Sequence, residues 1–142
     1  IDVFWLPSKG RQTILISPME QASMIQRIIA GDVPFSRQSL AVLKQLMLIR
    51  DAEPGRLYGK TGSGTDAKGT FVLGWFVGYA ESKGNTYAFA CTAQGKNVMS
   101  RQARAIVERV LESEGILARQ DAEQAESTVP VKAAPSASST VR

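Results

Sequence analysis

The sequence contains no histidine and a single cysteine, Cys91. The lack of histidine excludes every catalytic triad that uses an imidazole base, and with one cysteine it also excludes the common zinc sites, so we expect no metal. A disulfide within the chain is excluded as well. Cys91 lies in an alternating strand pattern, which is typical of a small residue in or beside the core.

Long apolar runs are also absent, so the sequence predicts no membrane-spanning segment. It opens on Ile1 and shows no basic region followed by an apolar one, so we recognise no secretion signal. The 17 Lys and Arg residues outnumber the 13 Asp and Glu residues, but they are scattered. This pattern argues against nucleic-acid binding, and 142 residues are enough for one domain.

The first third of the chain predicts two helices. Ser17-Pro18-Met19-Glu20 is typical of a capped helix start, and Gly31 is a natural stop. The apolar face of this helix would consist of Met24, Ile25, Ile28 and Ile29. A second helix is expected from Ser36, followed by a loop over residues 51–55, with a buried stripe made of Leu40, Leu43, Leu46 and Met47.

The middle of the chain predicts an antiparallel three-stranded meander. Its strands would be residues 57–61, 70–81 and 86–93, with a turn at residues 82–85. Gly74 and Gly78 would mark places of close packing. A third helix is expected over residues 100–114, with its contacts made by Ala105, Ile106, Val110 and Leu111. The predicted fold class is α/β (α+β), an antiparallel sheet flanked by helices.

The composition changes after Leu117. Residues 118–142 have almost no large apolar side chains and are rich in Ala, Ser, Gln, Glu and Pro. Such a segment cannot bury enough surface to offset its ordering entropy. We therefore predict a folded unit over residues 1–117 and a disordered tail over residues 118–142.

The strongest chemical signal is Lys60-Thr61-Gly62, followed by Ser63. Lysine offers a positive charge to an anionic substrate, threonine adds a hydroxyl, and glycine lets a ligand approach the backbone. A lysine on a strand edge is, however, more often plain solvated surface. A phosphate-binding loop is disfavoured, because Gly55 and Gly59 are separated by three residues where four are required, and a strand follows instead of a helix.

The order of segments around this motif resembles the C-terminal half of a class D (oxacillinase-type) serine β-lactamase and related penicillin-binding sensor domains. The similar segments are residues 2–6 (DVFWL), 16–21 (ISPMEQ), 33–36 (VPFS), 58–62 (YGKTG), 74–81 (GWFVGYAE), 87–90 (YAFA) and 111–117 (LESEGIL). The resemblance implies part of the serine β-lactamase or penicillin-binding transpeptidase fold. It also implies a periplasmic or secreted location.

The resemblance assigns roles to individual residues. Lys60, Thr61, Gly62 and Ser63 would line the substrate cleft, with Lys60 facing the carboxylate of a β-lactam. Trp5 would support a carbamylated lysine that acts as general base, and the family requires no other cofactor. The arginine that holds the substrate carboxylate falls on Ala103 here, with Arg101 and Arg104 as neighbouring substitutes.

The family's nucleophile and base lie in a Ser-x-x-Lys motif, which this sequence lacks. The interpretation is therefore a C-terminal portion of a β-lactamase, inactive alone, whose partner is the missing N-terminal half of the same domain. The alternative is a β-lactam-sensing receptor domain that is acylated without turnover. A third reading is a degenerate relative that binds a peptide or cell-wall fragment without chemistry.

Overall fold

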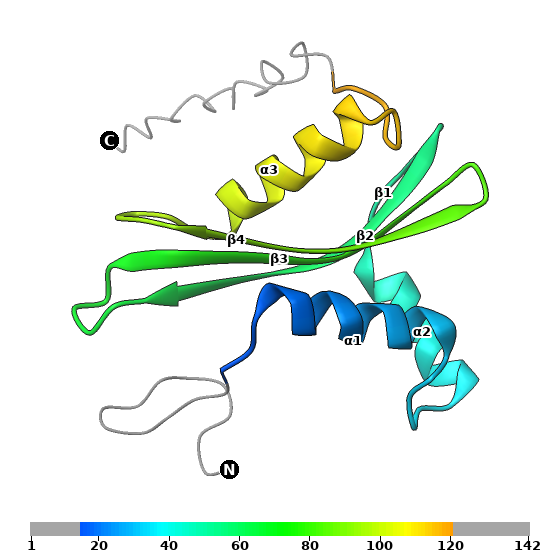
Figure 1. The fold of residues 1–142 in the computed structure, drawn as a ribbon, viewed down its shortest axis with the longest axis horizontal. Coiled ribbons are helices and arrows are strands. Elements are labelled where there is room, and N and C mark those ends of the chain that lie inside the picture. Colours follow the sequence, from blue (N-terminus) through cyan, green and yellow to red (C-terminus); the bar gives the residue numbers. More distant parts are fainter. Residues whose placement is uncertain (1–14, 121–142) are drawn as a thin grey trace, which may run out of the picture.

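The computed structural model describes residues 15–120. In chain order its elements are α1 (Pro18–Ala30), α2 (Arg37–Met47), β1 (Leu48–Ala52), β2 (Gly55–Thr65), β3 (Phe71–Ser82), β4 (Asn85–Gln94) and α3 (Ser100–Ser113). The antiparallel sheet has the order β1-β2-β3-β4 and separates α3 on one face from α1 and α2 on the other (Figure 1). The expected class, an antiparallel sheet flanked by helices, is confirmed. No helix among the described residues has both the length and the hydropathy to span a bilayer.

Helix α1 begins and ends as the sequence predicts. Ser17 Oγ accepts a hydrogen bond from the Glu20 amide at 3.2 Å, and the Ser17 amide donates to the Glu20 carboxylate at 2.7 Å. The backbone N–H and the hydroxyl of Ser17 favour the ionised carboxyl and lower the pKa of Glu20. Gly31 ends the helix with a φ of 72°, in the left-handed region that favours glycine.

Helix α2 and the segment that follows correct two expectations. Met47 is buried and Leu43 half-buried, but Leu46 is 79% exposed, so the predicted stripe was wrong at Leu46. Adjacent helical residues point about 100° apart, and in this helix Met47 faces the sheet while Leu46 points away from it. The predicted loop over residues 51–55 was too long: only Glu53 and Pro54 form a turn, since β1 extends to Ala52 and β2 starts at Gly55.

Strand pairing explains why β1 forms. Residues 48–52 pair with residues 55–58 of β2, and Asp51 accepts from Arg56 at 2.6 Å. Pairing also lengthens β2 to Thr65, beyond the predicted 57–61, because β3 supplies a partner along the whole strand. At the far end, Lys83 and Gly84 have φ values of 50° and 78°, which confirms the predicted hairpin turn.

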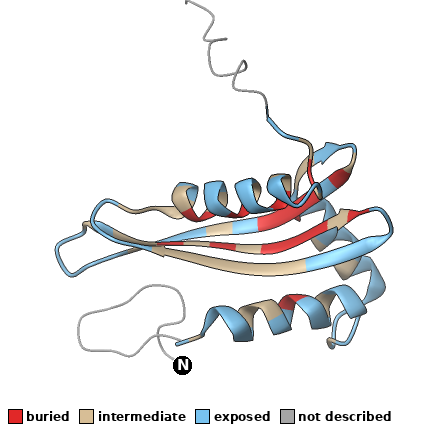
Figure 2. Ribbon diagram, turned by 45° about the horizontal axis from the view of Figure 1, so that its top comes forward, coloured by how far each residue is buried: buried red, intermediate tan, exposed pale blue. Residues whose placement is uncertain are grey.

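Two clusters of buried side chains hold the helices to the sheet, one on each face. Figure 2 shows that the buried residues concentrate where the sheet meets its helices. The cluster beneath α3 contains Leu57, Phe76, Ala80, Ala103, Val107, Leu111 and Leu117. The cluster on the opposite face contains Ile25 of α1, Met47 of α2, Tyr58 and Tyr79.

Helix α3 buries a different stripe from the predicted one. Its buried residues are Ala103, Val107 and Leu111, so only Leu111 was placed correctly. Ala105, Ile106 and Val110 are exposed. The predicted and the observed stripe both have helical spacing. The sequence pattern alone favours the stripe with Ile106 and Val110, because their side chains are larger than that of Ala103.

The folded contacts reach slightly past Leu117. The Arg50 guanidinium donates to the Ala118 carbonyl, and the Gln120 amide donates to Glu112 at 3.3 Å. Most of the predicted tail, residues 121–142, lies outside the described residues, and so does Trp5.

Candidate functional site

The Lys-Thr-Gly motif lies on a part of β2 whose outer edge has no partner strand among residues 15–120. Strand β1 pairs with β2 only as far as Tyr58, whereas β3 pairs with the other side as far as Thr65. Lys60, Thr61, Gly62 and Ser63 therefore follow one another along an open edge. The unpaired N–H and C=O groups of such an edge can bind an extended ligand.

Alternation along β2 sends the four side chains to both faces. Lys60 shares a face with Tyr58; it is exposed, and its ammonium donates to the Thr61 carbonyl at 2.9 Å. Thr61 is half-buried and shares the α3 face with Leu57. A Cβ built on Gly62 would meet only the Trp75 Cβ, at 3.8 Å, so packing among the described residues does not demand glycine there.

The N-terminus of α3 is fixed beside Ser63. The Ser100 amide donates to Ser63 Oγ at 3.0 Å. Gly74, opposite Ser63 on β3, makes this approach available, because a Cβ there would overlap the Met99 carbonyl. The sequence predicts close packing at Gly74 but not its partner Met99, which is 25 residues away in the chain.

The candidate arginines sit at this same end of α3. Arg101 is exposed and follows Ser100 directly, whereas Arg104 forms an ion pair with Glu108 at 2.9 Å. Ala103, where the family's arginine would fall by counting, is fully buried against the sheet. Arg101 lies near Ser63 because its neighbour Ser100 is hydrogen-bonded to Ser63. Arg104 lies one turn further along the helix.

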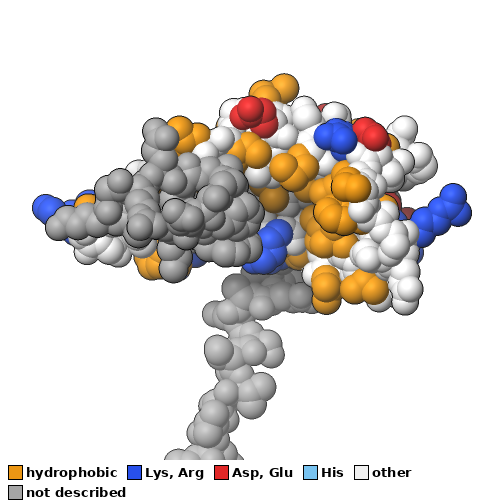
Figure 3. Space-filling model, turned by 90° about the horizontal axis from the view of Figure 1, so that it is seen from below, with side chains coloured by type: hydrophobic (Ala, Val, Ile, Leu, Met, Phe, Trp, Pro, Cys, Tyr) orange, Lys and Arg blue, Asp and Glu red, His pale blue; other side chains and the backbone are white. Residues whose placement is uncertain are grey.

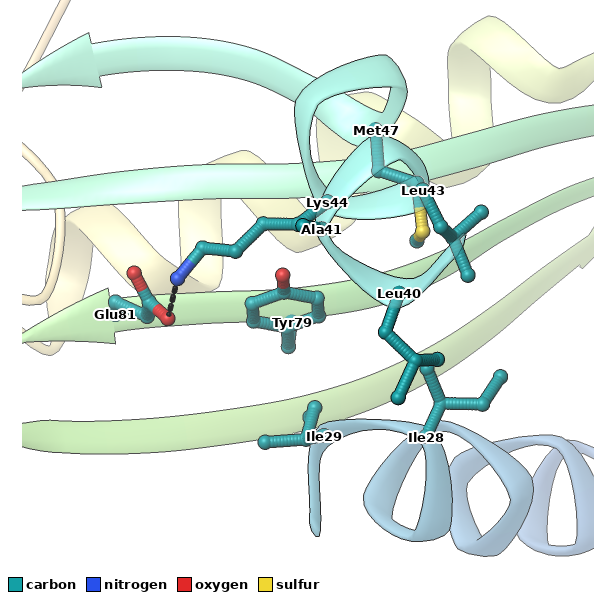
Figure 4. A pocket seen from close by; sticks show the side chains of 9 residues that line it. All are labelled: Ile28, Ile29, Leu40, Ala41, Leu43, Lys44, Met47, Tyr79 and Glu81. Atoms are coloured by element: carbon teal, nitrogen blue, oxygen red, sulfur yellow. Dashed lines mark hydrogen bonds and ion pairs between the residues drawn. The ribbon is translucent and has the colours of Figure 1, made fainter. Parts of the chain in front are cut away.

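A network of charged and aromatic side chains lies on the sheet face covered by α1 and α2. It is centred on Tyr58, two residues before Lys60 in β2. Tyr58 stacks on Tyr79 with ring centroids 4.6 Å apart and donates to Glu81 at 3.1 Å. Lys44 of α2 donates to the other oxygen of Glu81 at 2.6 Å and lies 5.1 Å from the centre of the Tyr58 ring. Figure 4 shows the Lys44–Glu81 pair beside Tyr79. This network is not evident from the sequence, because Lys44 and Glu81 are 37 residues apart.

Burial and this network shift several protonation equilibria. Burial raises the pKa of Tyr79 to about 12, with a further contribution from the Glu81 charge. Burial also raises the pKa of Tyr58, and its hydrogen bond to Glu81 adds to the effect. The hydrogen bond to Glu81 raises the pKa of Lys44. Lys44, Tyr79 and Glu81 also line a cavity of about 230 Å³ between α1, α2 and the sheet.

The outer side of α1 and α2 is apolar over much of its area. Figure 3 views this side, and hydrophobic side chains gather there. The exposed apolar residues of the two helices and their connection include Met19, Met24, Ile29, Phe35, Val42 and Leu46. Apolar surface gathered in this way is typical of a region that another polypeptide covers.

A comparison with known protein families identifies the domain to which these residues belong. The family model of the penicillin binding protein transpeptidase domain matches residues 3–112. This chain belongs to that family.

Two kinds of curated relatives resemble this chain, a beta-lactamase and a regulatory protein. Over 82% of this chain, 29% of residues are identical to the probable beta-lactamase YbxI of Bacillus subtilis (strain 168). The regulatory protein BlaR1 of Staphylococcus aureus is 30% identical over 80% of this chain. The chain spans only 40% of the length of YbxI and 19% of that of BlaR1.

Solved structures share the fold. The C-terminal domain of the BlaR penicillin-receptor of Bacillus licheniformis superposes with a TM-score of 0.66 at 29% identity, over 72% of this chain and 42% of that one. FUS-1 (OXA-85), a class D beta-lactamase from Fusobacterium nucleatum subsp. polymorphum, superposes with a TM-score of 0.66 at 26% identity. The match covers 82% of this chain and 46% of that one. The mixed helix and antiparallel sheet arrangement is thus part of the β-lactamase and transpeptidase fold.

Proposed function

We propose that this chain is the C-terminal part of a class D type β-lactam-reactive domain, in which Lys60, Thr61 and Gly62 form the wall that binds the substrate carboxylate. The observation that carries the proposal is the exposed Lys60 ammonium on an open strand edge, in a chain of the penicillin binding protein transpeptidase family. A fixed positive charge beside unpaired backbone groups suits an anionic, amide-like ligand.

We assign the roles of the individual residues from the family resemblance, and their positions support the assignment. The Lys60 ammonium would pair with the β-lactam carboxylate, and the Thr61 hydroxyl would donate to the same group. The backbone of Gly62 and Ser63 would hold the amide side chain of the substrate as an added strand. Arg101 would add a second positive charge, because Ser100 next to it is hydrogen-bonded to Ser63. The other candidate, Arg104, would first have to release Glu108.

The reaction itself needs groups that this sequence lacks. A serine oxygen would attack the lactam carbonyl, the C–N bond would break, and the ring nitrogen would take up a proton. Water would then release the acyl group, with a carbamylated lysine as base. Both reactive residues belong to a Ser-x-x-Lys motif that is absent here. We therefore place them in an N-terminal half of the same domain, and Trp5 would support the carbamylated lysine.

Exposed apolar residues support this division of the domain. Val42 and Leu46 of α2 are 48% and 79% exposed, and each would be buried by a further layer on that side of the helix. By the same proposal, the whole protein acts outside the cytoplasm, in the periplasm or as a secreted protein.

The first test uses the chain as it is. Incubation with a penicillin followed by intact mass spectrometry should show no acyl adduct, and no ring opening should occur above the rate in buffer. A stable adduct on any serine would contradict the proposal, because it would locate a nucleophile within these 142 residues.

The second test uses the longer protein, expressed from the upstream coding sequence. Lys60→Ala should lower kcat/KM for penicillins by about tenfold to a hundredfold, the worth of a charge-assisted hydrogen bond of roughly 1.5–3 kcal/mol. The same substitution should lower kcat/KM much less for a penicillin ester, which lacks the free carboxylate. Lys68 is an exposed lysine in the loop after β2, and Lys68→Ala is therefore the matched control, which should behave as wild type. Equal losses for acid and ester would refute the role of Lys60.

The arginines can be separated in the same assay. Arg101→Ala should reproduce the carboxylate-dependent loss, whereas Arg104→Ala should leave it unchanged. The reverse result would assign the second charge to Arg104.

The similarity to BlaR1 and to the BlaR penicillin-receptor domain supports a second candidate, a sensor that stays acylated. The longer protein distinguishes the two: an adduct that persists over many hours indicates a receptor, and one that is released with turnover indicates an enzyme.

A further inference from the structure

The pairing of strand β2 changes at Tyr58. Strand β1 pairs with its outer edge up to that residue, and the last pair is Leu48 with Tyr58. From Gly59 to Thr65, β3 is the one strand among the described residues that pairs with β2. A strand that is paired on one side only has fewer backbone hydrogen bonds, so its course depends more on the residues that anchor it.

The position of the Lys60 charge depends on that course. Lys60 is exposed, and within residues 15–120 its ammonium donates to the carbonyl of Thr61, the next residue of the same strand. The charge is therefore held by the backbone of β2 and not by a side chain from another element of the described fold. Whatever fixes the backbone at this point also fixes the charge.

Two anchors flank Lys60 along β2. After it, Ser63 accepts a hydrogen bond from the Ser100 amide at the start of α3. Before it, Tyr58 is only 4% exposed, and its hydroxyl donates to Glu81 of β3 at 3.1 Å. Tyr58 and Ser63 are five positions apart, so alternation places the two anchors on opposite faces of the sheet.

The anchor at Tyr58 also connects β2 to helix α2. Lys44 of α2 donates to the other oxygen of Glu81 at 2.6 Å (Figure 4), and its ammonium lies 5.1 Å from the centre of the Tyr58 ring. The Tyr58 ring stacks on Tyr79, with the two planes 13° apart. Each oxygen of the Glu81 carboxylate thus accepts from a different element, and hydrogen bonds to an ionised group are stronger than neutral ones. This carboxylate fixes β2 relative to α2 as well as to β3.

We propose that the Lys44–Glu81–Tyr58 network positions the Lys60 charge, an inference that rests on the proposed role of Lys60 as the partner of the β-lactam carboxylate. Tyr58 and Lys60 project from the same face of β2 with one residue between them, so a shift of the strand at Tyr58 moves Lys60 as well. A misplacement of about 1 Å can cost on the order of a hundredfold in rate. The network acts through Lys60 and does not itself touch the substrate.

The test uses the longer protein and compares a penicillin with its ester. Tyr58→Phe keeps the ring on Tyr79 and removes only the hydroxyl, so it should lower kcat/KM for the penicillin by roughly threefold to tenfold. This loss should be smaller than that of Lys60→Ala, because the charge remains, and it should nearly vanish for the ester. Glu81→Ala should cause a larger loss of the same kind. Glu81→Gln keeps one acceptor oxygen and should recover part of it.

A double-mutant cycle separates positioning from a general loss of structure. In a Lys60→Ala background, Tyr58→Phe should have no further effect on kcat/KM, because the charge that it positions is gone. An equal loss in both backgrounds, or for acid and ester alike, would overturn the proposal, since the network would then only stabilise the fold. Arg27→Met is the matched control: it breaks an exposed ion pair with Asp32 at the end of α1 and should leave both substrates unaffected.

The anchor can also be tested without a substrate. In the 142-residue chain, Tyr58→Phe should speed hydrogen exchange at the amides of residues 59–62 and leave the helical circular dichroism unchanged, whereas Arg27→Met should change neither. If Lys60→Ala proves indifferent to the carboxylate, the proposed function fails, and the exchange rates still decide whether the network holds β2. Unchanged exchange in the Tyr58→Phe chain overturns the positioning role.

Discussion

Replacing Gly74 with alanine tests how closely α3 must approach the sheet. The added Cβ would overlap the carbonyl of Met99 and crowd the amide of Ser100, both of which are backbone groups. The first turn of α3 would have to move away from β3. That movement would break the hydrogen bond from the Ser100 amide to Ser63.

The expected cost can be worked out from these contacts. Overpacking a tight site costs about 1–3 kcal/mol, and a lost hydrogen bond about 0.5–1.5 kcal/mol. Replacing glycine within a strand returns roughly 0.5–1 kcal/mol of backbone entropy. From these three contributions, we expect Gly74→Ala to lower the free energy of unfolding by about 1–3.5 kcal/mol, measured by urea denaturation.

Gly62→Ala is the matched control on the neighbouring strand. Its Cβ would be 3.8 Å from the nearest side chain, an ordinary contact, so the free energy of unfolding should stay the same or rise slightly. If Gly74→Ala were as stable as Gly62→Ala, the close approach of α3 would not limit stability. The account of how Ser63 is positioned would then be wrong.

Two further predictions concern charge. Because the pKa of Tyr79 is raised from 10 to about 12 by burial, the folded protein keeps a proton that the unfolded chain loses, and stability should fall by roughly 2–3 kcal/mol as pH rises from 10 to 12. Tyr79→Phe should lose that part of the pH dependence, and an unchanged profile would contradict the assignment. Arg50→Met should cost about 3–5 kcal/mol, because it leaves Glu112 unpaired in an ion pair whose side chains are only 13% and 19% exposed. Arg56→Met, which breaks an exposed pair with Asp51, should cost at most about 1 kcal/mol by the same denaturation assay, and equal costs would show that burial does not decide the difference.

Local chemistry made part of the fold predictable from sequence. The start of α1 depends on Ser17 and Glu20, which are three residues apart, and the β3–β4 turn depends on Lys83 and Gly84 alone. The Lys60 motif was predictable for a similar reason, since three adjacent residues and their flanking segments carry the family pattern. Features that depend on neighbours in sequence could be predicted without knowledge of the fold.

Features that depend on distant partners could not be predicted. Strand β1 forms because β2 pairs with it, and residues 51–55 by themselves resemble a loop. The buried side of α3 is set by where the sheet lies, so Ala103 faces the core and Ile106 does not. The pair between Lys44 and Glu81 joins residues 37 positions apart, and neither residue type signals the other.

Helix α3 is attached to the sheet at both of its ends. Ser100, at its first turn, is hydrogen-bonded to Ser63, and Glu112, near its last turn, is paired with Arg50. Twelve residues of helix separate these contacts, about 18 Å at 1.5 Å per residue. Opening of the helix at one end should therefore loosen the other, so that the two ends exchange their amide hydrogens as one cooperative unit. The precision with which the open edge of β2 presents Lys60 and Ser63 then depends in part on an ion pair at the opposite end of the helix.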